Sequence, residues 1–66
     1  MQIKVNGEIM SFTSNITLLQ LLESLEINPG SVAVELNGVI IDRDNYGKTG
    51  LNEGDVVEIV RFVGGG

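Results

Sequence analysis

The first residues of the chain alternate between apolar and polar side chains, which is the period of a β-strand. Met1, Ile3 and Val5 are the apolar members. Asn6-Gly7 then predicts a two-residue hairpin turn with positive φ at both positions, and residues 8–12 return as a second strand. Cross-strand partners share a face. The side chains expected on the core face are Met1, Ile3, Val5, Met10 and Phe12.

A helix is predicted to start after Thr17, which is a good N-cap residue. Gln20 stands three residues later, as a capping box requires, and Ile16 and Leu21 have the spacing of a hydrophobic staple. The apolar stripe of this helix comprises Leu18, Leu21, Leu22 and Leu25. Asn28-Pro29-Gly30 is expected to end the helix, because proline disfavours α geometry in the residue before it.

A second hairpin is predicted from residues 32–36 and 39–41, which flank another Asn-Gly turn, Asn37-Gly38. Both strands are rich in β-branched residues. The side chains expected to share the core face are Val32, Val34, Leu36, Val39 and Ile41.

The segment 42–50 is polar and predicts a loop, with Tyr46 as its one bulky member. Leu51 is expected to anchor this loop to the core. Glu53-Gly54-Asp55 predicts a turn. The last strand, residues 56–63, is the most hydrophobic one and leads into three glycines.

The predicted order of elements is hairpin, helix, hairpin, loop and strand. One amphipathic helix has one stripe to bury, so the simplest packing lays it across the apolar face of the sheet. An apolar final strand beside the first strand would have neighbours on both sides. The pattern therefore predicts an α+β fold with the β-grasp, or ubiquitin-like, arrangement of about five strands. We expect one domain, residues 1–63, followed by a flexible glycine tail, residues 64–66.

Composition excludes several classes of function. The 66 residues include no cysteine and no histidine, so thiol nucleophiles, histidine bases and the usual zinc sites are absent. The net charge is −5, and the four basic residues are scattered, which argues against nucleic-acid binding. No apolar run approaches the length of a membrane span or a signal peptide. We expect a protein of the cytosol with no metal and no bound cofactor.

The C-terminal end is the strongest candidate for chemistry. Gly64, Gly65 and Gly66 have no side chains, so they could enter a channel that is too narrow for any Cβ. The Gly66 carboxylate is ionised at neutral pH and is therefore a poor electrophile. It would need activation, for instance as an acyl-adenylate, before it could accept a nucleophile. An ordinary frayed terminus or a truncated linker is the alternative interpretation.

A partner surface is predicted on the outer face of the sheet. If Val57 and Ile59 point to the core, alternation places Glu58, Val60 and Phe62 outside. Exposed apolar side chains that lead to the tail could bind a partner, although scattered surface apolar residues are also normal. The residues expected at this interface are Ile9, Ile40, Val60, Phe62 and Val63. The carboxylates of the loops and turns are expected to be solvated rather than catalytic.

Five segments in this order resemble the sulfur carrier proteins of thiamin biosynthesis, the ThiS family. The segments are Val5-Asn6-Gly7-Glu8, Thr17-Leu18-Leu19-Gln20-Leu21-Leu22, Val32-Ala33-Val34-Glu35-Leu36-Asn37-Gly38, Glu53-Gly54-Asp55-Val56-Val57-Glu58-Ile59 and Phe62-Val63-Gly64-Gly65-Gly66. Each segment alone is weakly specific. Their order, the short chain and the glycine end together carry the resemblance, which covers essentially all of the chain.

The resemblance implies a protein co-substrate rather than an enzyme. A ubiquitin-activating-like adenylyltransferase would use ATP and Mg²⁺ to adenylate the Gly66 carboxylate. Sulfur from a cysteine desulfurase, or another persulfide donor, would then displace AMP and leave a thiocarboxylate. Thiazole synthase would receive the sulfur. No catalytic side chain of this chain is implied, and Gly65 is the neighbour of the modified residue.

Two other functions remain open at this point. A sulfur carrier for molybdopterin or for another thiolated product has the same outline, although the molybdopterin relatives are usually longer. A ubiquitin-like binding module without covalent chemistry is the alternative from a different class.

Overall fold

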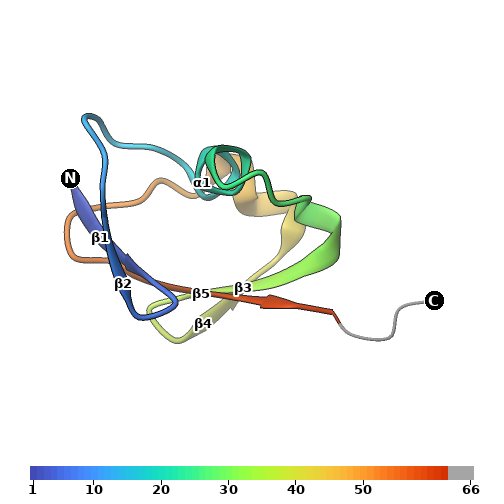
Figure 1. The fold of residues 1–66 in the computed structure, drawn as a ribbon. Coiled ribbons are helices and arrows are strands. Elements are labelled where there is room, and N and C mark those ends of the chain that lie inside the picture. The colour runs from blue at the N-terminus through green and yellow to red at the C-terminus, as the bar shows by residue number, and fades with distance from the viewer. Residues whose placement is uncertain (63–66) are drawn as a thin grey trace.

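In the computed structural model, which describes residues 1–62, five strands form one mixed sheet and the helix α1 lies across one of its faces (Figure 1). The strand order is β2-β1-β5-β3-β4. The strands are β1 (Gln2–Val5), β2 (Glu8–Ser11), β3 (Val32–Leu36), β4 (Val39–Ile41) and β5 (Val56–Arg61). The predicted α+β class and β-grasp arrangement are confirmed, including the place of the last strand beside the first.

Both hairpins have the turn geometry that their Asn-Gly sequences predict. Asn6 and Gly7 have φ values of 48° and 84°, and Asn37 and Gly38 have 51° and 85°. The first turn pairs Ile3 with Met10, two of the residues predicted to share the core face. Beyond the strand ends, the amino group of Met1 donates to the Phe12 carbonyl and the Phe12 amide donates back to Met1, both at 2.8 Å.

The helix α1 (Leu18–Ser24) begins as predicted, with a complete capping box. The Gln20 amide donates to Thr17 Oγ1 at 3.1 Å, and the Thr17 amide donates to Gln20 Oε1 at 2.9 Å. Leu18, Leu21 and Leu22 are fully buried against the sheet. A helix of seven residues is not stable alone, so this burial supplies its stability.

The prediction that the helix continues to Asn28-Pro29-Gly30 is wrong. Its last residue is Ser24, and Glu26 adopts the left-handed conformation with φ of 58°. The Ile27 amide donates to the Leu22 carbonyl at 2.9 Å and the Glu26 amide to the Glu23 carbonyl at 3.0 Å. This pair of bonds is a Schellman motif, with glutamate at the position that glycine usually occupies. Pro29 instead begins the 3₁₀ turn η1 (Pro29–Ser31).

Two features of the second half also differ from the prediction. Val39 lies opposite Leu36, as expected, but its side chain is 60% exposed. It stands at the turn end of an edge strand, which has a neighbour on one side only. The segment predicted as a loop contains the 3₁₀ helix η2 (Arg43–Lys48), which packs against α1 and buries Tyr46.

The core lies between α1 and the inner face of the sheet. Leu51 is buried in it, so the prediction that this residue anchors the preceding segment is confirmed. The buried apolar side chains are Ile3, Val5, Leu18, Leu21, Leu22, Val32, Val34, Tyr46, Leu51, Val57 and Ile59. Val63 and the three glycines lie outside the described residues, so the predicted boundary at residue 63 and the flexible tail stay predictions.

Candidate functional site

The strand β5 lies at the centre of the sheet and leads to the C-terminal glycines. It pairs in parallel with β1, where Val57 lies beside Val5, and antiparallel with β3. The strand was predicted to reach Val63, but it ends at Arg61. The Phe62 amide still donates to the Ser31 carbonyl at 3.1 Å, so Phe62 remains attached to the body of the protein.

The asparagines of the two hairpin turns hold β5 at both of its edges. Beyond the end of β1, Ile59 donates its amide to Asn6 Oδ1 at 2.7 Å and accepts from Asn6 Nδ2 at 3.1 Å. On the other side, the Val56 amide donates to Asn37 Oδ1 at 2.9 Å, and Asn37 Nδ2 donates to Asp55 Oδ1 at 3.1 Å. The two amide side chains thus replace missing strand neighbours and fix the path of β5 toward its end.

The prediction that four apolar side chains point away from the core is confirmed. Ile9, Ile40, Val60 and Phe62 are exposed, with fractions from 54% for Val60 to 70% for Ile40. Val63, the fifth predicted interface residue, lies outside the described residues. Whether these residues bind a partner stays a prediction.

The exposed apolar residues do not form one continuous patch. Ile9 is on the edge strand β2 and Ile40 on the opposite edge strand β4, while Val60 lies on β5 beside Ala33 of β3. Charged residues separate them. Lys4 pairs with Ile9, and Glu35 of β3 lies between Ile40 and Glu58.

Sequence reasoning missed two residues of this face, Val56 and Glu35, and the pairing of Glu35 with Glu58. Val56 is 40% exposed, and it belongs outside by the same alternation that places Val60 there. Glu35 and Glu58 lie directly opposite each other on β3 and β5. Alternation placed Glu58 outside and could have placed Glu35 there, but their pairing depends on a register between distant segments.

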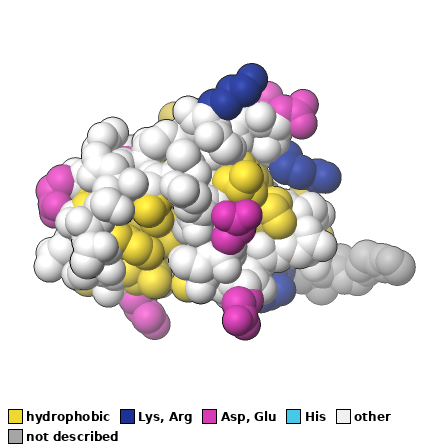
Figure 2. Space-filling view, turned by 90° about the horizontal axis from the view of Figure 1, so that it is seen from above, with side chains coloured by type: hydrophobic (Ala, Val, Ile, Leu, Met, Phe, Trp, Pro, Cys, Tyr) yellow, Lys and Arg dark blue, Asp and Glu magenta, His cyan; other side chains and the backbone are white. Residues whose placement is uncertain are grey.

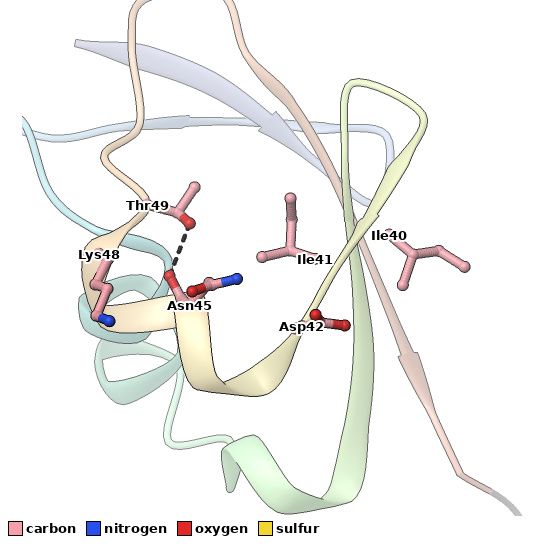
Figure 3. Close-up of a pocket in the computed structure, with 6 residues that line it drawn as sticks. All are labelled: Ile40, Ile41, Asp42, Asn45, Lys48 and Thr49. Carbon is pink, nitrogen blue, oxygen red and sulfur yellow. Dashed lines mark hydrogen bonds between the residues drawn. The ribbon is translucent and has the colours of Figure 1, made fainter.

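A hollow of about 340 Å³ lies beside β4 and η2 (Figure 3). Its lining residues are Ile40, Ile41, Asp42, Asn45, Lys48 and Thr49. Figure 3 shows Ile40 and Ile41 pointing to opposite sides of β4, and Thr49 Oγ1 donates to the Asn45 carbonyl at 2.7 Å. The hollow is open, and its polar groups form no arrangement of nucleophile and base.

The helix side of the molecule, seen in Figure 2, has hydrophobic side chains in separate places, with acidic and basic side chains around them. Among residues 1–62, no group of three or more carboxylates could hold a metal ion. No helix in the described part of the chain has the length and apolar character needed to cross a membrane. The structure thus leaves the end of β5, with the outer face beside it, as the candidate site.

Comparisons with known proteins agree on one family. The model of the ThiS family matches residues 3–66, which include the three C-terminal glycines. A sulfur carrier protein ThiS of Bacillus subtilis is 37% identical over 65 residues, which cover 97% of this chain and 98% of that protein. The crystal structure of a thiamine biosynthesis protein (ThiS) from Geobacter metallireducens superposes with a TM-score of 0.87 at 33% identity, and each chain is covered completely.

Two longer relatives are named thiazole synthase. Those of Paramagnetospirillum magneticum and Magnetococcus marinus are 39% and 42% identical to this chain over 66 residues. The chain spans about a fifth of the length of these relatives, because the matched part is 20% of each.

Proposed function

The chain belongs to the ThiS family, and we propose that it is the sulfur carrier of thiamine biosynthesis, with the Gly66 carboxylate as the group that carries sulfur. The observation that supports this most directly is the extent of the family match, which includes the whole glycine end. The chain is a co-substrate of other enzymes in this proposal, and it works in the cytoplasm, where ATP is supplied.

The first step activates the carboxylate. An oxygen of the Gly66 carboxylate attacks the α-phosphorus of ATP in a Mg²⁺-dependent adenylyltransferase, and pyrophosphate leaves. The resulting acyl-adenylate is an electrophile, whereas the free carboxylate is not. The chain has no histidine and no cysteine, so the proposal assigns the catalytic groups to the partner.

The second step exchanges oxygen for sulfur. The terminal sulfur of a persulfide, supplied by a cysteine desulfurase, attacks the acyl carbon and AMP leaves. A thiol then attacks the acyl disulfide, so that the thiocarboxylate departs and the thiol is oxidised to a disulfide. The thiocarboxylate of Gly66 next donates its sulfur to the thiazole ring at thiazole synthase. This chain resembles one fifth of each of two proteins named thiazole synthase, and this resemblance supports thiazole synthase as a partner.

The body of the protein serves to present the tail in this scheme. The outer face of the sheet, with Ile9, Ile40, Val60 and Phe62 exposed, is the surface proposed to contact the adenylyltransferase. Val63 would extend that contact toward the active site. A rigid sheet is well suited to this purpose, because β5 is hydrogen-bonded at both edges.

Intact-mass spectrometry tests the covalent proposal. The purified protein is incubated with ATP, Mg²⁺, the adenylyltransferase, a cysteine desulfurase and cysteine. We expect a mass gain equal to the exchange of one oxygen for sulfur, and no gain for a variant that lacks Gly66. A protein that binds the adenylyltransferase but never gains this mass would be a non-covalent ubiquitin-like module. Thiazole formation with thiazole synthase then distinguishes a thiamine carrier from a carrier for molybdopterin or another product.

A further inference from the structure

The outer face of the sheet contains an unfavourable pair of like charges. Glu35 of β3 and Glu58 of β5 are direct cross-strand partners, and both side chains point away from the core. The Cβ atoms of such partners are about 5 Å apart, and two like charges at this separation destabilise a sheet. Glu35 is half-buried, which increases the effect because water screens the pair less.

No basic residue is a direct cross-strand partner of either carboxylate in the described sheet. Lys4 pairs with Val56, two residues along β5 from Glu58 on the same face, and directly opposes neither carboxylate. The one cation of β5, Arg61, pairs with Val32 and so alternates to the other side from Glu58. The two carboxylates therefore form the negative centre of the outer face, in a protein whose net charge is −5.

The surroundings of the pair are apolar. Ile40 is the direct neighbour of Glu35 on β4, and Val60 and Val56 stand on either side of Glu58 along β5. All three are exposed. A partner that covers these side chains would remove water from the two carboxylates, and it would then have to supply opposite charge.

We propose that the Glu35–Glu58 pair receives a basic side chain of the adenylyltransferase when that partner covers the outer face of the sheet. Arginine suits the site because its planar guanidinium can donate to two carboxylates at once. The inference rests on the proposed function, and it adds the chemistry by which the carrier body is recognised. The pair lowers the stability of the free carrier and gains its partner cation only in the complex.

This proposal predicts effects of opposite sign on folding and on binding. Glu35→Gln and Glu58→Gln should each raise the melting temperature by about 2–4 °C, because either one removes the repulsion. The double variant should gain little more than one of the single variants, since the repulsion can be removed only once. Each single variant should bind the adenylyltransferase at least about fivefold more weakly, and this loss should shrink as salt is raised.

Calorimetric titration of the adenylyltransferase with each variant measures the binding, and thermal unfolding measures the stability. Glu23→Gln is the matched control, because Glu23 is an exposed residue of α1 and the substitution changes the net charge equally. The control should bind as the wild type does. Equal binding by wild type, Glu35→Gln and Glu58→Gln would overturn the inference, as would a loss confined to thiazole synthase binding.

The experiments can refute the charge-recognition inference and the proposed carrier function separately. A wild-type protein that acquires the thiocarboxylate, together with Gln variants that bind normally, refutes the charge-recognition inference alone. A wild-type protein that never acquires the thiocarboxylate refutes the carrier function, whatever the Gln variants do.

Discussion

The side chain of Asn6 should contribute more to stability than an exposed turn residue normally does. Asn6→Gly keeps the positive φ of 48° without strain, so it isolates the amide group. The substitution removes the bonds of 2.7 and 3.1 Å to the Ile59 amide and carbonyl, and both are partly buried. Each such bond contributes about 0.5–1.5 kcal/mol net, so the expected loss is about 2 kcal/mol.

This loss is large for so small a domain. At about 0.05–0.15 kcal/mol per residue, a chain of this length has a free energy of unfolding of about 3–10 kcal/mol. Asn6→Ala should cost about 1 kcal/mol more, because alanine pays the steric strain of the left-handed conformation. Asn37→Gly is the comparison at the other edge of β5. Its bonds are exposed, so about 1 kcal/mol is expected.

Urea unfolding followed by circular dichroism measures these differences, and the fluorescence of Tyr46, the only tyrosine, gives a second probe. Amide hydrogen exchange adds a local readout, because the Ile59 amide should lose protection by about tenfold or more in Asn6→Gly. The reasoning is refuted if Asn6→Gly unfolds within about 0.5 kcal/mol of wild type with unchanged exchange at Ile59.

Three further predictions follow from the structure. Glu26→Gly should raise the free energy of unfolding by about 1 kcal/mol in urea titrations, because glycine adopts the φ of 58° without strain; an unchanged midpoint would contradict this. Leu22→Ala should lower the free energy of unfolding by about 2–5 kcal/mol in urea titrations, since the Leu22 side chain is fully buried. Phe62→Ala should leave the melting temperature nearly unchanged but weaken adenylyltransferase binding by calorimetry; a large fall in melting temperature would show that Phe62 supports the fold.

The parts of the fold that follow from local rules were predictable. The two Asn-Gly pairs determine tight turns, and these turns set the register of their strands without reference to the rest of the chain. The start of α1 was predictable for the same reason, because Thr17 and Gln20 satisfy each other's backbone groups.

The end of the helix was not predictable from the same kind of signal. Asn28-Pro29-Gly30 is a clear stop sequence, but the helix has already ended at Ser24. Glutamate at position 26 carries no sign of a left-handed residue. The early stop lets Ile27 pack against the core, so tertiary packing overrides the local preference.

The candidate site was predictable in part. Alternation along β5 places Val60 and Phe62 outside once Val57 and Ile59 are assigned to the core. The pairing of Glu35 with Glu58 joins segments that no turn connects directly, so its register follows only from the assembled sheet.

The sheet order also limits how a partner can approach the carrier. Both edges of β5 are occupied, by β1 and Asn6 on one side and by β3 on the other, so no strand of a partner can pair with it as far as Ile59. The inner face is covered by α1. Along β5, a partner can pair with the backbone only after Ile59, so on this strand it must recognise the body through side chains of the outer face. In the proposed function, the body binds the partner and the glycine end reacts. Charges on the outer face should therefore control affinity without altering the chemistry at Gly66.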